Sequence, residues 1–395
     1  MDNHYKKLLF VNGHLNAGGV EKSLHDLLIH LDKSKYDIDV LLLEGKGDLY
    51  ANSIPDNIHI IVFDTRQAFG PLFSTLIRNL FHGNFSLVIF RMIIVLSSLF
   101  GKKLYCFIKP LLGIKKHYDI AIAYRMGLPN EIVSLTVKSE KKICWWHHGE
   151  NFYSDTQINY IKQLWGNMNA IITVSEGCKN MITNKFHINK DLIKVIPNII
   201  DLDAIEQLSG NVNPYEKSDC INIVSLGRLG FEKHMDDIPV LSQKMLDRGF
   251  NHFKWHIIGD GEMFEDIKQK IQKFNVEKYV FLMGKKSNPY PFLKYADILV
   301  HTSHVEAHCL TILEAMALKT PCVVTQTTIP QDFTENGVNC IIAKQQIESQ
   351  VSCILTMIEK LNTTSNMTDK AYQLVRDNYN WRKITHQFDI LMEAI

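Results

Sequence analysis

Hydrophobic residues along the chain form two alternating patterns, short runs of buried-strand type and longer amphipathic stretches. The short runs are rich in Ile, Val and Leu, and they occupy 8–11, 38–43, 119–124, 170–175, 221–227, 255–261, 297–303 and 321–325. After the first run, one helical stripe of apolar residues is formed by Val20, Leu24, Leu27, Leu28 and Leu31. The alternation predicts an α/β fold in which right-handed βαβ units build parallel sheets.

The pattern pauses once, around 195–220, where a polar stretch precedes a new strand. The chain has 395 residues, well above the usual length of one domain, so two separate cores are expected. Each half starts with a strand that runs into a glycine-bearing loop, 12–19 in the first half and 227–233 in the second. Ligands of doubly wound sheets bind at the carboxyl ends of the strands. We therefore expect two Rossmann-like domains whose parallel sheets face a central cleft.

Composition narrows the class of protein. Hydrophobic residues make up 46% of the chain and charged residues 22%, which excludes a fibrous or largely disordered protein. The 43 basic and 42 acidic residues nearly cancel, so we expect no nucleic-acid partner. Eight cysteines without CxxC spacing indicate reduced thiols and a cytoplasmic protein, and no signal peptide is expected at the start. The most apolar stretch, 85–100, is too short to span a bilayer.

Two carboxylates, Glu306 and Glu314, stand eight residues apart where a predicted strand gives way to a predicted helix. One interpretation of Glu314 is structural, because Thr311 three residues before it gives the form of a capping box. The other is functional. A helix N-terminus at the carboxyl edge of a parallel sheet binds anions, and carboxylates beside it can accept hydrogen bonds from ribose or sugar hydroxyls. Such a pair suits a nucleotide-sugar.

The E-x7-E spacing, followed by Leu-Glu-Ala-Met-Ala at 313–317 and Pro-Cys-Val-Val at 321–324, resembles the donor-site signature of retaining glycosyltransferases of family 4. Four further segments resemble motifs of that family in the same order, namely the VIPN linker at 195–198, GRL…K at 227–233, GDG at 259–261 and YNW at 379–381. The resemblance is strong over 190–395 and weaker over 1–65 and 119–190. It implies a GT-B architecture with three parts, an acceptor-side domain at 1–196, a nucleotide-sugar-binding domain at 197–376 and a C-terminal helix at 377–395 that crosses back.

The resemblance also implies roles for individual residues. Glu314 would accept hydrogen bonds from the ribose, and Glu306 would hold hydroxyls of the donor sugar. Arg228 and Lys233 would clamp the donor diphosphate and offset the charge of the leaving group; without the family, the same two residues would be interpreted as solvated charges. The glycines that would let the backbone approach the donor are Gly18, Gly19, Gly227, Gly259 and Gly261.

The sequence departs from the family after Glu306, where Ala307-His308-Cys309 replaces the usual Gly-Phe-Gly. His308, Cys309 and Leu310 would then contact the donor, and the added side chains would narrow its approach. Two alternatives to a transferase follow: a catalytically inactive, glycosyltransferase-like subunit that binds sugar nucleotides, and a nucleotide-sugar epimerase on the same fold.

Adjacent histidines at 147 and 148 invite a zinc interpretation, but neighbouring side chains of an extended chain point to opposite faces. The family carries a catalytic histidine after this strand, and His148, beside Gly149, matches it better than His147. The two D-x-D segments at 37–39 and 201–203 are interpreted as surface acids. We therefore expect neither a metal nor another cofactor.

The segment 65–118 is unusual because it has no Asp or Glu but eight basic residues, together with many Phe, Leu and Ile. It could be a buried core helix edged with lysines. Basic amphipathic helices that lie on an anionic membrane fit better. The sequence therefore predicts a peripheral protein at the inner face of the cell membrane. The family resemblance implies that it moves a sugar with retention from a nucleoside diphosphate-sugar, with UDP chosen because it is the frequent donor of the family, to a lipid-linked saccharide or a cell-surface polysaccharide precursor.

Overall fold

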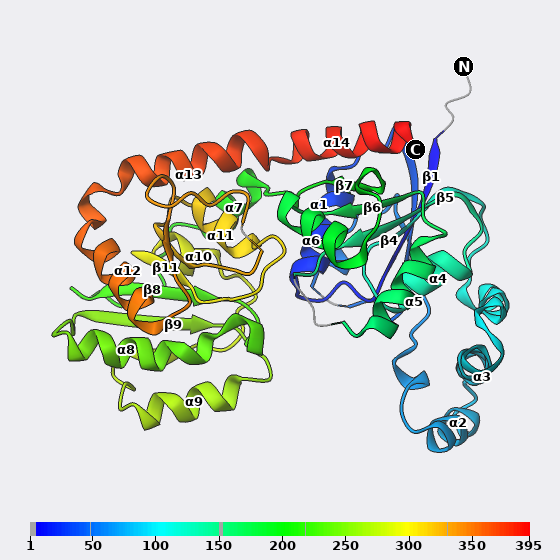
Figure 1. Cartoon of the computed structure of the whole chain (residues 1–395), viewed down its shortest axis with the longest axis horizontal. Helices are drawn as coiled ribbons and strands as arrows, with labels where there is room; N and C mark the ends of the chain where they lie inside the picture. The colour runs from blue at the N-terminus through cyan, green and yellow to red at the C-terminus, as the bar shows by residue number, and fades with distance from the viewer. Residues whose placement is uncertain (1–4, 48, 150–152, 218, 330) are drawn as a thin grey trace. The chain divides into compact units, whose positions relative to one another are not determined.

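The computed structural model describes residues 5–47, 49–149, 153–217, 219–329 and 331–395 (Figure 1). Two compact units account for the described part of the chain. Within these ranges, the first unit contains residues up to 147, then 153–196 and 385–395, and the second contains 148–149 and 197–384. Each unit is an α/β layer structure around its own parallel sheet, so the predicted fold class is confirmed.

The first unit is built on a seven-stranded sheet with the order β3-β2-β1-β4-β5-β6-β7, in which every neighbouring pair is parallel. Its strands are β1 Lys6–Asn12, β2 Tyr36–Leu42, β3 His59–Val62, β4 Tyr118–Ala123, β5 Ser139–Trp146, β6 Ala170–Thr173 and β7 Ile193–Val195. The central strands read as continuous apolar runs because helices cover both faces of the sheet. These helices are α1 Gly19–His30, α4 Leu128–Leu135, α5 Asp155–Trp165 and α6 Glu176–Phe186.

The C-terminal helix α14 (Trp381–Ala394) ends on the first unit, to which residues 385–395 belong. The ring of Phe388 stacks on Phe10 of β1 at 6.3 Å between centroids, and its side chain is fully buried. Next to it, the hydroxyl of Tyr36 donates a hydrogen bond to Asp389 at 2.8 Å. Buried aromatic packing and this polar contact fix the end of the chain on β1 and β2.

A helical insertion lies between β3 and β4. It consists of α2 Leu72–Phe81, α3 Phe85–Phe100 and the 3₁₀ segment η3 Lys102–Leu112. Phe90 and Ile93 of α3, with Tyr105 and Ile108 of η3, enter the core of the first unit. None of the described helices is both long and apolar enough to cross a membrane.

One sequence interpretation in this unit is wrong. Asp39, expected to be a surface acid, is buried on β2 and accepts a hydrogen bond from the hydroxyl of Tyr118 at 2.6 Å. Lys116 donates to both Asp37 and Asp39. Asp37 and Asp39 therefore link β2 to β4 and to the residues just before β4. The second D-x-D segment begins a helix, where the Asp201 side chain caps the backbone N–H of Ala204.

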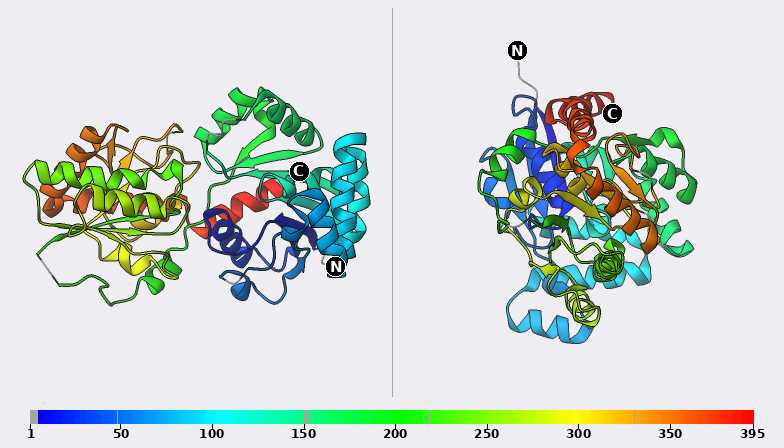
Figure 2. Two further views of the ribbon diagram at one scale, coloured as in Figure 1. Left: turned by 90° about the horizontal axis from the view of Figure 1, so that it is seen from below. Right: turned by 90° about the vertical axis from the view of Figure 1, so that its left-hand side faces the viewer.

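The second unit is built on a six-stranded parallel sheet with the order β10-β9-β8-β11-β12-β13. Its strands are β8 Ile221–Leu226, β9 Phe253–Ile258, β10 Val280–Leu282, β11 Ile298–His301, β12 Cys322–Thr325 and β13 Ile341–Ala343. Helices on one face are α8 Ile238–Asp247, α9 Phe264–Lys273 and α12 Ile347–Glu359. Those on the other are α7 Leu202–Ser209, α10 Tyr290–Lys294, α11 Leu310–Ala317 and α13 Ser365–Asn378 (Figure 2).

The strand order of this second sheet reverses at β8. Strands β9 and β10 extend the sheet on one side of β8, and β11 to β13 extend it on the other. The loops that follow β8 and β11 therefore leave the same edge of the sheet side by side, which is where doubly wound folds bind ligands. Short 3₁₀ segments complete the described elements, namely η1 Ala51–Ser53, η2 Arg66–Ala68, η4 Lys190–Leu192, η5 Phe231–Lys233, η6 Met235–Asp237 and η7 Leu361–Thr363.

Candidate donor site in the second unit

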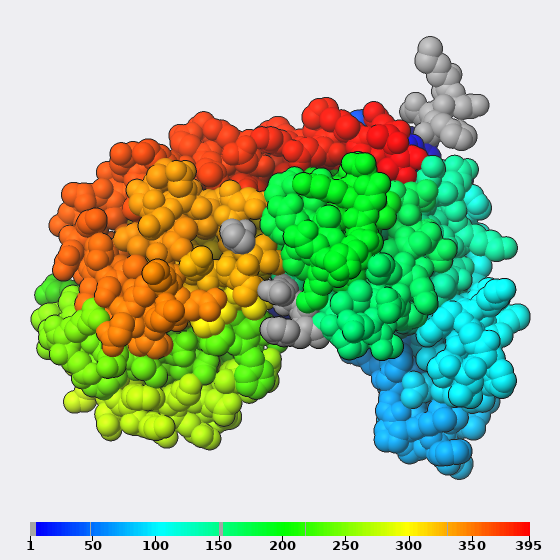
Figure 3. All heavy atoms as spheres, viewed as in Figure 1, coloured from blue at the N-terminus to red at the C-terminus, as the bar shows by residue number. Residues whose placement is uncertain are grey.

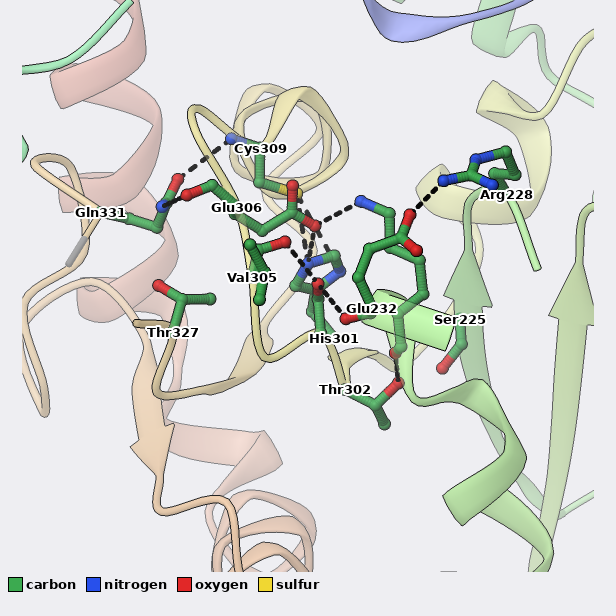
Figure 4. Close-up of polar contacts among 12 residues, drawn as sticks. Ser225, Arg228, Glu232, His301, Thr302, Val305, Glu306, Cys309, Thr327 and Gln331 are labelled. Atoms are coloured by element: carbon green, nitrogen blue, oxygen red, sulfur yellow. Dashed lines mark hydrogen bonds and ion pairs between the residues drawn. The ribbon is translucent and has the colours of Figure 1, made fainter. Parts of the chain in front are cut away.

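Hydrogen bonds join the loop after β8 to the loop after β11 (Figure 4). The hydroxyl of Thr302 donates a hydrogen bond to the carbonyl oxygen of Lys233 at 2.7 Å. The hydroxyl of Ser303 donates one to the backbone carbonyl oxygen of Glu232 at 3.0 Å. The backbone N–H of His304 also donates to Glu232, at 3.1 Å. The two loops thus act as one support, although they are far apart in the sequence.

Four ionisable side chains meet on this support. The Nζ of Lys233 lies 2.5 Å from Oε1 of Glu306, and Nε2 of His301 lies 2.9 Å from the same oxygen. The sulfur of Cys309 lies 3.4 Å from Nε2 of His301. Glu306, His301 and Cys309 are all buried, so these contacts exchange little with water. A buried charge requires such pairing, because an unpaired one would cost several kcal/mol (~3–5).

The protonation states of the three residues follow from their contacts. Burial alone would raise the pKa of Glu306, but the charge of Lys233 and the hydrogen bond from His301 outweigh it and hold the pKa well below its usual range. Burial opposes protonation of His301, yet its contacts with Cys309 and Glu306 raise its pKa to about 9. Burial lowers the pKa of Lys233, but its contacts with Glu306, Cys309 and Glu232 together outweigh burial and raise the pKa above its usual range. Near neutral pH the cluster therefore holds one carboxylate between two cations.

The predicted glycines of this unit lie where the backbone of one loop touches that of another. A Cβ atom at Gly259 would lie 1.8 Å from the carbonyl oxygen of Gly227, and one at Gly261 would lie 2.6 Å from that of Leu229. The backbone N–H of Leu229 donates to Asp260 at 2.9 Å. Only glycine allows this approach, which aligns the two loops at the carboxyl edge of β8 and β9.

Arg228 is exposed at the edge of this support and is bound to two carboxylates. Its Nη1 donates to Glu262 at 3.0 Å, and its Nη2 pairs with Glu232. Its guanidinium and the Lys233 ammonium, expected to form a diphosphate clamp, thus each bind protein carboxylates in this structure. A diphosphate would have to replace Glu232 and Glu262 around Arg228.

The helix α11 begins at Leu310, with Cys309 as its N-cap residue and without a side-chain cap. The backbone N–H of Cys309 donates to Oε1 of Gln331 at 3.0 Å. The capping-box interpretation of Thr311 and Glu314 is therefore wrong, because Thr311 lies inside the helix. Glu314 is buried on this helix and accepts a hydrogen bond from the hydroxyl of Tyr290 at 3.1 Å.

His308, which occupies the position of the family phenylalanine, is packed like an aromatic core residue. Its ring lies 5.3 Å from Phe333 and 5.3 Å from Tyr379, between centroids, and Nδ1 lies 3.4 Å from Nδ2 of Asn198. Among the described residues, Nε2 has no hydrogen-bond partner. Burial lowers the pKa of His308 to about 3, so the ring is neutral at physiological pH. Leu310, the other predicted contact, packs partly buried against the same core.

The predicted glycines of the first half, Gly18 and Gly19, lie in the first unit. Gly18 precedes α1, which begins at Gly19, and a Cβ atom at Gly18 would lie 2.1 Å from Oε2 of the buried Glu21. Nη1 of Arg125, which follows β4, lies 3.5 Å from Oε1 of Glu21. This pair was missed by the sequence analysis, although an arginine directly after the strand-like run at 119–124 is a usable signal.

The two adjacent histidines belong to different units of the chain. The ring of His147 lies 4.7 Å from Tyr124 and stacks on Trp145 at 5.7 Å, within the first unit. His148 groups with the second unit. The neighbouring Gly149 lies against that unit, since a Cβ atom there would lie 2.7 Å from Val305 and 3.1 Å from the backbone carbon of Glu306. The residue after the predicted catalytic histidine therefore touches the loop that carries Glu306.

Two groups of described side chains have the composition to hold a metal ion. They are His234, Asp237 and His304 in one group, and His301, Glu306 and Cys309 in the other. In the second group the ammonium of Lys233 already neutralises Glu306, which disfavours a further cation. In the first group the rings of His234 and His304 are stacked, with 3.6 Å between their centroids. A metal ion lies in the plane of each imidazole that binds it, and two stacked rings do not share a plane.

Comparison with known families agrees with this geometry. Residues 17–204 match the sequence model described as Glycosyltransferase Family 4, and residues 213–374 match that described as Glycosyl transferases group 1. Together the two models account for most of the chain. The chain belongs to the group 1 and family 4 glycosyltransferases. Its fold is that of the GT-B members of this group.

Curated relatives of this glycosyltransferase include the following three proteins. An uncharacterised glycosyltransferase of Methanocaldococcus jannaschii is 29% identical over 55% of this chain and 56% of the relative. The poly(ribitol-phosphate) alpha-N-acetylglucosaminyltransferase of Staphylococcus aureus is 24% identical over 61% of this chain and 48% of the relative. The GPI3 subunit of the phosphatidylinositol N-acetylglucosaminyltransferase of Saccharomyces cerevisiae is 24% identical over 55% of this chain and 49% of the relative. The matches thus span about half the length of these relatives.

Solved structures share the fold over the whole chain. HepE of Anabaena, crystallised with UDP-glucose, has a TM-score of 0.73 and 17% identity, and the match covers 99% of this chain and 100% of HepE. TarM has a TM-score of 0.70 and 16% identity, and the match covers 99% of this chain and 100% of TarM. At such identities the likeness concerns the fold.

One residue of the candidate donor site was missed by the sequence analysis. His301 ends β11 at the carboxyl edge of the sheet, buried between Glu306 and Cys309. A histidine at the end of the apolar run 297–303 is a weak signal, because buried histidines in strands are common core residues. His301 is a candidate residue of the donor site because its Nε2 lies 2.9 Å from Oε1 of Glu306.

Proposed function

We propose that this glycosyltransferase transfers a sugar from a UDP-sugar to a saccharide acceptor, with retention of the anomeric configuration and without a metal ion. The observation that carries the proposal is the buried carboxylate of Glu306, held between Lys233 and His301 beside the start of α11. The group sits at the carboxyl edge of a parallel sheet, where the fold binds ligands. The UDP and UDP-glucose complexes of HepE support the choice of donor.

Each site residue has a chemical task in this proposal. Glu314, buried on α11, accepts hydrogen bonds from the ribose hydroxyls, while Glu306 accepts them from the donor sugar. Arg228 and Lys233 bind the diphosphate, and the first turn of α11 offers backbone N–H groups and the positive end of the helix dipole to it. Negative charge grows on the diphosphate as the glycosidic bond breaks, so these cations stabilise the transition state more than the ground state. His148 contacts the donor sugar as the predicted catalytic histidine.

Metal independence follows from the same charges. A divalent cation in a sugar-nucleotide site neutralises the diphosphate. Here the N-terminus of α11 would do so together with Arg228 and Lys233, once the donor displaces the carboxylates that pair with them. The retaining outcome rests on the family resemblance. It requires the acceptor hydroxyl to approach on the face from which the diphosphate departs.

The acceptor is proposed to be a lipid-linked saccharide or a cell-surface polysaccharide precursor. The names of two relatives support this class, since one acts on poly(ribitol-phosphate) and another is named for phosphatidylinositol. Both acceptors combine hydroxyl groups with phosphate.

The test is direct. Purified protein is titrated calorimetrically with UDP, UDP-glucose and UDP-N-acetylglucosamine. The same titration with GDP-sugars and ADP-sugars tests whether the site selects the uracil base. We expect selective binding of a UDP-sugar and transfer of its radiolabelled sugar to a membrane or wall-polymer extract. Absence of binding to every sugar nucleotide would refute the proposal.

A second candidate, a sugar-nucleotide-binding subunit without turnover, is favoured by one observation. The Arg228 guanidinium is bound to Glu232 and Glu262, so it is not free to stabilise a leaving group unless both carboxylates move. Tight donor binding with neither transfer nor hydrolysis of the labelled donor would identify this alternative. Interconversion of two UDP-sugars would identify an epimerase.

A further inference from the structure

The helix α2 has its polar and apolar sides exchanged relative to an ordinary surface helix. Thr75 and Asn79 face inward with 3% and 2% of their surface exposed, and Nδ2 of Asn79 donates to the carbonyl oxygen of Gln67 at 2.8 Å. Phe73 and Phe81 face outward with 79% and 86% exposed. Ile77 and Leu80 lie on the same outward face, because positions four, seven and eight residues apart align on a helix. A helix in contact with water alone would be stabilised by the opposite arrangement.

The next helix, α3, is apolar both on the side that packs on the protein and on its exposed side. Phe90 and Ile93 point into the core of the first unit. On the other side Phe85, Ile89 and Leu96 are exposed, and the stripe ends at Leu99 and Phe100, which are 70% and 77% exposed. We call the exposed apolar residues of α2 and α3 together the outward stripe. Figure 3 shows the segment that contains both helices, in blue to cyan, standing out from the remainder of the first unit.

An exposed apolar surface of this extent marks an interaction site, and the charges around it identify the partner. Residues 65–118 contain no Asp or Glu. Among the described residues, Arg66 pairs with Asp64 and Lys116 with Asp37, which leaves six cations of the segment without a carboxylate. They are Arg78, Arg91, Lys102, Lys103, Lys109 and Lys115. A partner that covers the stripe must therefore be both apolar and anionic.

A basic hollow lies directly after the end of the stripe. Its lining includes Lys102, Lys103 and Lys142, together with Ser134 and Asn167. The Nζ of Lys102 is held 5.1 Å from the ring of Tyr105 and 4.9 Å from that of Tyr160, so its position is fixed by the protein. Phosphate oxygens fit such a hollow, since they accept hydrogen bonds from ammonium groups such as those of Lys102 and Lys103.

We propose that the outward stripe inserts into the interface of an anionic lipid membrane, with the six cations against lipid phosphates and the hollow around one headgroup. A bilayer supplies both properties that the surface requires, apolar chains below a layer of negative charge. A second copy of this chain does not, because two carboxylate-free segments would bring their cations together. The helices lie in the interface rather than across it, since α3 with its 16 residues is about 24 Å long and the apolar core of a bilayer is about 30 Å thick.

This inference stands apart from the donor chemistry, because binding to lipid can be measured without turnover. It deepens the proposed function at one point, the delivery of the enzyme to a lipid-linked acceptor. If sugar-nucleotide binding fails and vesicle binding holds, only the proposed function is lost, and the reverse outcome removes only the docking.

The full-length protein is sedimented with vesicles of phosphatidylcholine alone and of phosphatidylcholine mixed with phosphatidylglycerol, over a series of salt concentrations. We expect binding to the mixed vesicles that weakens with salt and persists in part at high salt. The salt-sensitive part reports the cations, whose attraction falls off within about 8–10 Å at physiological ionic strength. The persistent part reports inserted apolar side chains.

Two sets of variants separate these contributions. Phe73→Ser with Phe81→Ser should lower vesicle affinity by at least about tenfold and remove the salt-resistant part. Lys102→Glu with Lys103→Glu should lower affinity for anionic vesicles by about fivefold or more per residue and leave binding to neutral vesicles unchanged. Matched controls lie in the second unit, where Leu208→Ser with Val212→Ser changes exposed apolar residues without effect on binding. Circular dichroism and melting temperature verify that each variant is folded.

Other outcomes would overturn the docking. Equal binding to neutral and anionic vesicles would do so, as would binding that survives both pairs of substitutions. Concentration-dependent dimers that the Phe73→Ser and Phe81→Ser changes abolish, without vesicle binding, would show that the stripe joins two copies of the chain.

Discussion

The ammonium of Lys233 lies 2.5 Å from the carboxylate of Glu306, although the two residues are separated by 73 positions in the sequence. Each was assigned a separate task by the sequence, Lys233 on the diphosphate and Glu306 on the donor sugar. The contact makes them one unit, because the position and charge of each depend on the other. A donor that enters this site must exchange part of this ion pair for contacts of its own.

The ion pair predicts the stability of Glu306→Gln. Loss of the carboxylate leaves the buried Lys233 and His301 without their charge partner, and breaking a buried pair costs about 3–5 kcal/mol. We expect a decrease of this size in the free energy of unfolding, measured with urea at pH 7. Glu232→Gln is the matched control, since its partner Arg228 is exposed and the loss should stay below about 1 kcal/mol. Equal losses in both variants would contradict the coupling.

Binding should separate the two carboxylates of the E-x7-E spacing. Glu314→Gln should weaken the UDP-sugar and free UDP alike, by about 10–100-fold, because a hydrogen bond to a charged group is worth about 1.5–3 kcal/mol. Glu306→Gln should weaken the UDP-sugar far more than free UDP, which meets this residue only indirectly, through the contact of Lys233 with the diphosphate. Isothermal titration calorimetry with both ligands measures this. The roles are wrongly assigned if the two variants lose the same affinity for UDP.

Chelation should leave turnover intact. We expect transfer of a radiolabelled sugar to continue in EDTA, since Arg228 and Lys233 neutralise the diphosphate. Arg228→Ala should lower kcat by about 100-fold with a smaller change in KM, because charge on the leaving group is greatest in the transition state. Activity that disappears with EDTA and returns with Mg²⁺ or Mn²⁺ would show that a metal is required, and His304→Ala would then test the group around His234.

Acid should destabilise the second unit through His308. Its pKa is about 3 in the folded chain and about 6.5 in the unfolded chain, so between these values the unfolded chain binds more protons. Stability therefore falls as pH is lowered through this window, and His308 accounts for about 2 kcal/mol of the loss between pH 7 and pH 5. His308→Phe and His308→Gln should both remove this part. Urea unfolding at the two pH values measures it, and an unchanged loss in both variants would refute the assignment.

A methyl group at Gly259 should disrupt the donor loops. The Cβ of Gly259→Ala would lie 1.8 Å from the carbonyl oxygen of Gly227, so one loop must move and sugar-nucleotide affinity should fall by more than about tenfold. Gly249→Ala is the control, because no atom lies within 4 Å of the added group and only its positive φ is unfavourable, at about 1–2 kcal/mol. Retained affinity in Gly259→Ala would show that the loops adapt.

The sequence determined the fold class and the region of the donor site. Parallel strands buried on both faces require unbroken apolar runs, and these runs are visible without any knowledge of their partners. The apolar stretch 85–100 coincides with α3, and the glycines at 259 and 261 lie at backbone contacts that exclude a side chain.

Tertiary structure decided what spacing along the chain cannot express. Asp39 looked like a surface acid, but Tyr118 and Lys116 from another part of the sheet enclose it. Thr311 and Glu314 had the spacing of a capping box, yet the helix begins at Leu310, two residues too early for that role, and Tyr290 binds the carboxylate instead. Likewise, composition placed cations and apolar residues in one segment, while only packing shows that α2 buries Asn79 and exposes Phe81. In each case the outcome depends on which distant surface covers the residue, and that is fixed only when the whole unit is assembled.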